Sequence, residues 1–134
     1  MIPRLPAALS IALIALGGIS PVPHAKAADG EPHSVTVAMK EYEFLPSHLI
    51  FRHGQTYRLH LVNLGKELHE FTAAKFFQSV EAKNPEILAN GGGEIVLQPH
   101  EAKDFDFVAK KTGHFALTCA DHDWIGMVGD IAVE

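Results

Sequence analysis

Short stretches of alternating apolar and polar residues, separated by turn-forming residues, run along most of this chain and restrict its fold more than any other feature. Residues 34–39 and 57–62 place apolar side chains at every second position, as a strand with one buried face does. Further short segments follow at residues 69–72, 94–98, 105–108, 114–119 and 128–133. Short strands at steady spacing indicate a sandwich or a barrel. We therefore expect an all-β fold of about eight strands.

Two segments depart from this regular pattern. Pro46 interrupts residues 42–51, and a proline inside a strand segment favours the edge of a sheet because it has no N–H to donate. Residues 75–90 carry apolar side chains at helical spacing, broken near Pro85. We predict one short helical excursion there, and we interpret its two phenylalanines as core residues.

One loop near the C-terminus combines residue types that bind soft metal ions. Cys119, His122 and Met127 form the sequence Cys-x2-His-x4-Met between two predicted strands. A thiolate, an imidazole and a weak, distant thioether are ligand types of the trigonal copper sites that cycle between Cu(I) and Cu(II). Such a site needs a second histidine. His69, which follows a turn and starts a predicted strand, is the best candidate.

Each of these residues has an ordinary interpretation when taken alone. A lone cysteine is usually a small buried hydrophobe, and a lone methionine usually fills a core. The argument for a metal site is that all four occur together at this spacing. The remaining histidines of the exported domain lack ligand spacing, and we interpret them as surface residues: His33, His48, His53, His60, His100 and His114.

Composition excludes several classes of function. A single cysteine allows neither an intramolecular disulfide nor a binuclear copper centre bridged by two cysteines. The sequence has no His-x-His pair for the additional coppers of a copper oxidase or reductase, so we expect no enzyme activity. The formal charge of −5 argues against a nucleic-acid partner, because phosphate binding requires clustered Lys and Arg.

The first 27 residues have the pattern of a secretory signal peptide. Arg4 supplies a positive charge, residues 5–19 are mainly apolar, and Ala25-Lys26-Ala27 has the small-x-small pattern of a cleavage site. The apolar stretch is shorter than the roughly 20 residues that span a bilayer, although an uncleaved anchor is the alternative. Cleavage after Ala27 would leave one soluble periplasmic domain, residues 28–134, with a formal charge of −7.

With His69, Cys119, His122 and Met127 in place, the chain resembles the cupredoxins, the small blue-copper proteins of the plastocyanin and pseudoazurin type. The resemblance also covers Tyr42-x-Phe44-x-Pro46, Gly54, Asn63-x-Gly65, His69-x-Phe71 and Gly126-Met127. It implies a Greek-key β-sandwich that holds one copper ion. His69 and His122 would be the imidazole ligands, Cys119 the thiolate and Met127 the axial thioether.

The sequence departs from the best-known cupredoxins around these ligands. Glu70 occupies the position after the first histidine, where plastocyanin and azurin have an asparagine that ties the two ligand-bearing segments together. Asp121 and Asp123 bracket His122, and are interpreted either as solvated loop charges or as groups that select a basic partner or a copper donor. Trp124 is interpreted as a lid over the metal or as local packing, in preference to an exposed docking aromatic.

Two functions are compatible with this ligand set. The first is an exported one-electron carrier that exchanges electrons with a redox partner protein. The alternative is periplasmic copper handling, meaning storage, delivery or tolerance, with a copper donor or acceptor protein as the partner. A methionine-rich second site would favour copper handling, but the exported domain has only Met39 and Met127. We expect a monomer in either case.

Overall fold

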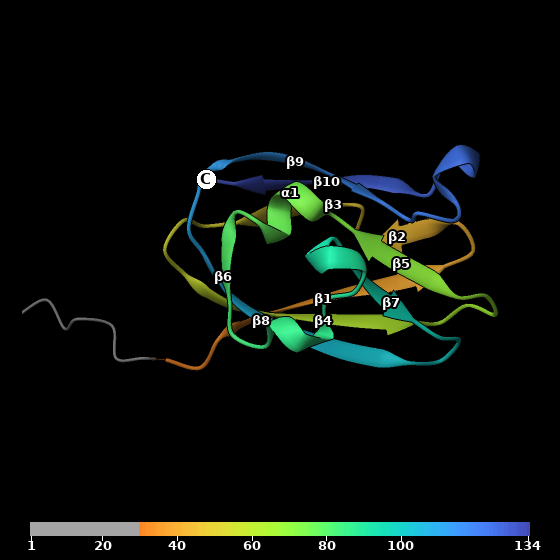
Figure 1. Cartoon of the computed structure of the whole chain (residues 1–134), viewed down its shortest axis with the longest axis horizontal. Helices are drawn as coiled ribbons and strands as arrows, with labels where there is room; N and C mark the ends of the chain where they lie inside the picture. The colour runs from red at the N-terminus through yellow and green to blue at the C-terminus, as the bar shows by residue number, and fades with distance from the viewer. Residues whose placement is uncertain (1–29) are drawn as a thin grey trace, which may run out of the picture. The chain divides into compact units, whose positions relative to one another are not determined.

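A computed structural model describes residues 30–134 of the chain, and these form a sandwich of two five-stranded sheets (Figure 1). The predicted signal peptide, residues 1–27, lies outside the described residues. Within the described part, no helix has both the length and the apolar character needed to cross a membrane.

The first sheet has the strand order β2-β1-β4-β8-β6. These strands are β1 (His33–Lys40), β2 (Glu43–Leu45), β4 (Thr56–Asn63), β6 (Val80–Ala82) and β8 (Ala102–Ala109). The second sheet has the order β3-β10-β9-β5-β7. Its strands are β3 (His48–Phe51), β5 (His69–Thr72), β7 (Glu94–Leu97), β9 (Gly113–Thr118) and β10 (Val128–Val133).

The chain passes repeatedly from one sheet to the other, which places strands far apart in sequence side by side. β1 pairs with β4 and β3 with β10 in parallel, while the other strand pairs are antiparallel. The all-β Greek-key sandwich implied by the resemblance is confirmed. Residues 30–134 contain ten strands instead of about eight.

The segment around Pro46 explains one of the additional strands. β2 ends at Leu45 and lies at the edge of the first sheet, whereas β3 begins at His48 at the edge of the second. The chain therefore changes sheets at the proline, and the prediction of an interrupted edge segment is confirmed.

The predicted short helical excursion within residues 75–90 is confirmed, but only part of this segment is helical. Helix α1 (Ala74–Phe77) is a single turn, and two 3-10 turns follow at Pro85–Ile87 and Asn90–Gly92. Between them, β6 pairs with β8 at the edge of the first sheet. The spacing of apolar residues around Val80 is compatible with a helix or a strand. Backbone pairing with β8 makes this segment a strand.

The core lies between the two sheets and is rich in phenylalanine. Phe76 and Phe77 are buried, as predicted, together with side chains from strands of both sheets. The largest fully buried aromatic residues are Phe44, Phe51, Phe71, Phe76, Phe105 and Phe107.

Candidate metal centre

Three segments meet at one end of the sandwich, which we call the metal end. They are the β1–β2 turn at Glu41–Tyr42, the β4–β5 loop at residues 64–68 and the β9–β10 loop at residues 119–127, which contains the 3-10 turn Asp123–Ile125. All three lie at the right of Figure 1. The Glu41 carboxylate accepts hydrogen bonds from the backbone N–H groups of Lys66 and Glu67, which joins the first two segments.

The metal end brings together three of the four predicted ligands. One ligand atom from each of His69, Cys119 and His122 lies within 4.8 Å of the other two. The Nδ1 atom of His69 lies 3.9 Å from the Cys119 sulfur, and the Nδ1 atom of His122 lies 3.3 Å from it. Both imidazoles therefore turn the same nitrogen towards the thiol.

His69 and Cys119 are positioned by paired strands of the second sheet. His69 begins β5, which pairs with β7 on one side and with β9 at the register of Thr72 and Thr118. Cys119 follows the last residue of β9. The side chains of His69 and Cys119 are completely buried, so these two donor atoms are held by sheet structure and shielded from water.

His122 and Met127 are positioned by a tight loop. The N–H of Cys119 donates to the carbonyl of Met127 (3.0 Å), and the N–H of Met127 donates to the carbonyl of His122 (3.2 Å). Gly126 has φ +95°, a left-handed conformation that favours glycine. Met127 is completely buried at the end of this loop, so the fourth predicted ligand lies in the same closed segment as two of the others.

Glu70 links the two ligand-bearing segments. Its Oε2 atom accepts hydrogen bonds from the Cys119 thiol (2.9 Å) and from the N–H of Asp121 (3.4 Å), while its own N–H donates to the Cys119 sulfur (3.4 Å). The Glu70 carboxylate thus finds its own hydrogen-bond donors and makes the tie expected of an asparagine at this position.

Burial determines the protonation of the thiol and of His69. Burial raises the pKa of Cys119 to about 12, and the hydrogen bond to Glu70 adds to the effect. Burial also lowers the pKa of His69, with a further contribution from the nearby His122, although surrounding carboxylates oppose it. Without a metal the site therefore holds a neutral thiol and a neutral His69 at neutral pH.

The donor set fits copper. A metal ion displaces the proton of a coordinating thiol, and a thiolate with neutral imidazoles is a combination that copper binds well. The cluster of His69, Cys119 and His122, with Met127 buried in the same loop, is consistent with a type 1 copper site.

The residues that surround the ligands differ from expectation in two respects. Trp124 is 77% exposed and its indole N–H donates to the Asp121 carbonyl (3.0 Å), so it does not cover the site as a lid. Sequence reasoning also missed Glu41 and Glu67, which lie beside the two histidines. The positions of these two glutamates in the sequence do not indicate a role at the site, because only the folding of the loops brings them to it.

The structure also shows the role of Asn63. Its buried side chain donates to the carbonyls of Glu67 (2.7 Å) and Leu97 (3.2 Å) and accepts from the N–H of Gly65 (2.9 Å). These bonds fix the β4–β5 loop immediately before His69. The turn-forming Asn-x-Gly sequence was the available signal.

The other histidines lie away from this cluster. His48 pairs with Asp130, and His60 pairs with Asp104 on the outer side of the first sheet. The prediction that His60 points outward is confirmed, since its side chain is 40% exposed.

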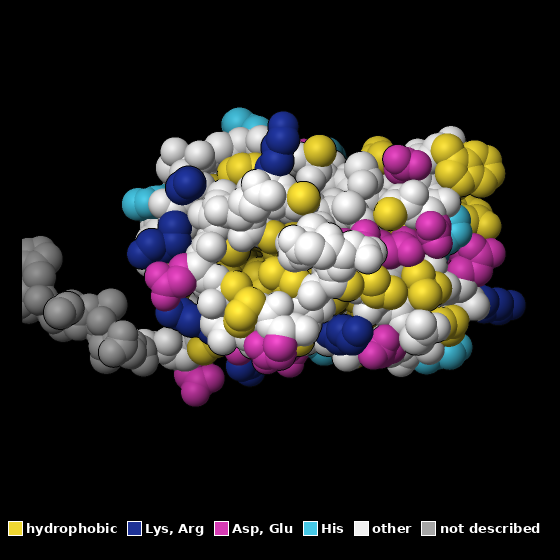
Figure 2. Space-filling view, viewed as in Figure 1, with side chains coloured by type: hydrophobic (Ala, Val, Ile, Leu, Met, Phe, Trp, Pro, Cys, Tyr) yellow, Lys and Arg dark blue, Asp and Glu magenta, His cyan; other side chains and the backbone are white. Residues whose placement is uncertain are grey.

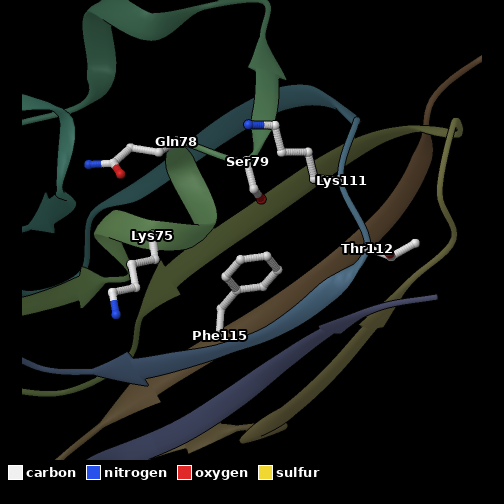
Figure 3. A pocket seen from close by; sticks show the side chains of 6 residues that line it. All are labelled: Lys75, Gln78, Ser79, Lys111, Thr112 and Phe115. Carbon is white, nitrogen blue, oxygen red and sulfur yellow. The ribbon is translucent and has the colours of Figure 1, made fainter.

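A cavity of about 230 Å³ lies near the start of β9, whereas Cys119 follows the end of that strand. In Figure 3 the Phe115 ring lies among the other lining side chains. These are Lys75, Gln78, Ser79, Lys111 and Thr112. None is a predicted ligand, so this cavity is separate from the metal end.

Comparisons with known proteins agree with the fold. The model of the cupredoxin-like domain matches residues 9–133. The structure is similar to that of reduced auracyanin from the photosynthetic bacterium Roseiflexus castenholzii, with a TM-score of 0.58 and 19% sequence identity over 78% of this chain and 99% of that one. Auracyanin B is similar with a TM-score of 0.57 and 16% identity, over 80% of this chain and 93% of that one. No curated protein matches the sequence.

Proposed function

This chain belongs to the cupredoxin-like domain family, and from that premise we propose that it is an exported one-electron carrier with a single copper ion. His69, Cys119, His122 and Met127 would hold the ion. The observation that carries the proposal is the convergence of one thiol sulfur and two imidazole Nδ1 atoms at a largely buried site. Bound copper would supply the exchange of single electrons between Cu(I) and Cu(II).

The protein holds these donor atoms in nearly fixed positions. His69 and Cys119 are anchored by β5 and β9, and the hydrogen bonds between Cys119, His122 and Met127 close the loop. Small rearrangement of the ligands lowers the barrier to electron transfer. The burial of His69, Cys119 and Met127 excludes water from the site.

Exposed residues next to His122 provide an approach for a redox partner. The His122 side chain is 14% exposed, and it is followed closely by the exposed apolar residues Trp124 and Ile125. Asp121 and Asp123 are exposed in the same loop. Figure 2 shows apolar and acidic side chains together at this end of the described part. A partner protein with a basic, partly apolar face would fit this surface.

The proposal is for a carrier and not for an enzyme. Among residues 30–134, one cluster of three or more His, Cys, Asp or Glu side chains could hold a metal ion, and it is the site described above. Oxidases and reductases that bind oxygen or nitrite at copper need further histidine clusters. We place the protein in the periplasm because residues 1–27 have the pattern of a signal peptide, and we expect it to be a monomer there.

The visible absorption spectrum after addition of one equivalent of Cu(II), followed in air for hours without reductant, tests this function. A stable and intense thiolate-to-copper band is expected for the carrier. A second sample reduced with ascorbate should regain the band when ferricyanide is added; copper that stays bound as Cu(I) without return of the band would favour copper handling, and absence of a band in the first sample would refute the site. Cys119→Ala should abolish the band, whereas His60→Gln, on the outer side of the first sheet, should leave it unchanged.

A further inference from the structure

The outer nitrogen of each imidazole at the metal end faces a carboxylate. The Nε2 atom of His122 lies 2.9 Å from Oε2 of Glu67. The Nε2 atom of His69 lies 3.8 Å from Oε1 of Glu41. Since both Nδ1 atoms face Cys119, each histidine lies between the thiol and an acidic side chain.

Glu67 is held in place against His122. Its second oxygen accepts a hydrogen bond from the Tyr42 hydroxyl (3.4 Å), and the Tyr42 ring packs against the His122 ring with a centroid distance of 5.1 Å. The His122 side chain is largely covered, although it belongs to an exposed loop. Glu67 and Tyr42 therefore fix the side of the imidazole that points away from the thiol.

Glu41 is the carboxylate nearest to the outer nitrogen of His69. That nitrogen is fully buried and has no hydrogen-bond partner within residues 30–134. Glu41 is anchored by the backbone N–H groups of Lys66 and Glu67. A Cβ at Gly65 would collide with the Glu41 carboxylate, so glycine at this position leaves the space that the carboxylate occupies.

We propose that Glu41 and Glu67 are positioning residues for His69 and His122, each placing its negative charge beside the outer nitrogen of one imidazole so that both rings present Nδ1 to the metal before it arrives. The proposal rests on the proposed function in one respect, namely that these histidines are metal ligands. It goes beyond that function by assigning a separate carboxylate to each ligand.

The physical basis is the choice between two forms of the neutral imidazole. A carboxylate beside Nε2 favours, through its negative charge, the form in which that nitrogen carries the proton, and this form leaves the Nδ1 lone pair directed towards the thiol. The negative charge also raises the donor strength of the ring and favours the ion of higher charge. Both carboxylates should therefore strengthen Cu(II) binding more than Cu(I) binding.

The first test uses the metal-free protein and is independent of copper. Long-range proton–nitrogen NMR of histidine-labelled protein at pH 8 reports which ring nitrogen carries the proton. We expect the proton on Nε2 of both His69 and His122. Glu67→Ala should give His122 a mixture of the two forms, while Glu67→Gln, which keeps an acceptor oxygen, should largely preserve the original form. Unchanged His122 signals in Glu67→Ala would overturn the proposal for this residue.

Glu41 is tested in the same way through His69. Because Glu41 also anchors the β4–β5 loop, Glu41→Ala is compared with Tyr42→Phe, which removes one contact at the same turn without removing a carboxylate. A mixed His69 signal in Glu41→Ala alone supports the proposal. The same change in both variants would show a general loosening of the turn and would overturn it.

The second test measures the affinity of each variant for Cu(II) and Cu(I) by competition with chelators. We expect Glu67→Ala and Glu41→Ala to weaken Cu(II) binding about tenfold, the lower end of the effect of removing a group that orients a metal ligand, and Cu(I) binding less. Glu43→Gln, at an exposed position on β2, is the matched control and should change neither affinity. Equal losses for both ions, or no loss, would overturn the charge argument.

Failure of this inference is distinguishable from failure of the proposed function. If wild-type protein shows no thiolate-to-copper band, the copper function fails whatever the NMR signals show. If the band is present but the histidine signals do not depend on Glu41 and Glu67, only the positioning role fails.

Discussion

The two ends of the sandwich are stabilised by different kinds of interaction. At the start of β4 and the end of β8, aromatic rings pack closely, and we call this region the aromatic end. The ring centroids of Phe51 and Tyr57 are 4.8 Å apart, and those of Phe76 and Phe107 are 5.4 Å apart. Phe115 completes this cluster through its contact with Phe76. Rings of this size bury large apolar areas and contribute strongly to stability.

The metal end instead buries polar groups that lose contact with water. His69, Asn63 and Glu70 are all less than 10% exposed there. Burial of such groups costs free energy unless each finds a partner. The two ends are connected by β4, β5, β8 and β9. The packing of rings at the aromatic end therefore offsets part of the free-energy cost of burying polar groups at the metal end.

The largest effect should follow from removing a ring at the aromatic end. Phe107→Ala should lower the free energy of unfolding by about 3–5 kcal/mol, because it deletes a fully buried ring and leaves a cavity. The copper band of the folded variant should keep its position. Urea unfolding and the visible spectrum measure the two properties. A shifted band would show that the two ends are not independent, and Phe107→Leu should give a smaller loss of stability.

Asn63→Ala is expected to affect both properties. Loss of its hydrogen bonds leaves buried partners unsatisfied and should cost about 1–3 kcal/mol. Because the same bonds fix the loop that carries Glu67 and precedes His69, the copper band should also shift. Unfolding in urea and the spectrum of the copper-loaded variant would again be compared. An unchanged spectrum would contradict a role for Asn63 in shaping the metal end.

The buried thiol predicts a pH dependence of the metal-free protein. The pKa of Cys119 is raised from 9.0 to about 12 in the folded state. Between these values the unfolded chain releases the thiol proton and the folded protein retains it, so stability falls as the pH rises. At pH 10 the loss from this group should be about 1.4 kcal/mol. Urea unfolding at pH 7 and pH 10 should show a larger fall for wild type than for Cys119→Ala; equal falls would contradict the prediction.

Glu70→Asn should have the smallest effect on stability and a measurable effect on the reduction potential. Asparagine is able to tie the two ligand segments, but it removes the negative charge that favours Cu(II) beside the metal. The potential should rise by up to about 59 mV, the value of a tenfold change for one electron. Redox titration measures it, with Glu43→Gln as the control. An unchanged or lowered potential would refute a charged Glu70 at the site.

The aromatic end and the ligands differ in how far the sequence predicts them. The alternation of apolar and polar residues predicted most strands. Phe76 could be assigned to the core because a large apolar side chain is rarely stable elsewhere. The spacing of Cys119, His122 and Met127 indicated one loop, since these residues are close in the chain. His69 needed the additional inference that a strand would carry it to that loop.

The groups around the ligands could not be predicted in this way. Glu41 and Glu67 approach the histidines from two loops, and glutamates in loops are usually solvated. The edge strand β6 was mistaken for helix because it has only three residues. A segment this short has too few apolar positions to distinguish the helical period of about 3.6 residues from the strand period of two. Trp124 was interpreted as a lid or as local packing, but its side chain in the 3-10 turn is largely exposed.

The parallel pairing of β10 with β3 makes completion of the sandwich depend on a long-range contact. β10 joins Ile131 to Leu49 and Val133 to Phe51, so strands about 80 residues apart must meet. Contacts over such sequence separations slow folding. Residues 128–133 directly follow Met127 in the chain. Until β10 pairs with β3, the second sheet is incomplete and the end of the ligand loop is not held, so closure of the sandwich and completion of the ligand set are one step.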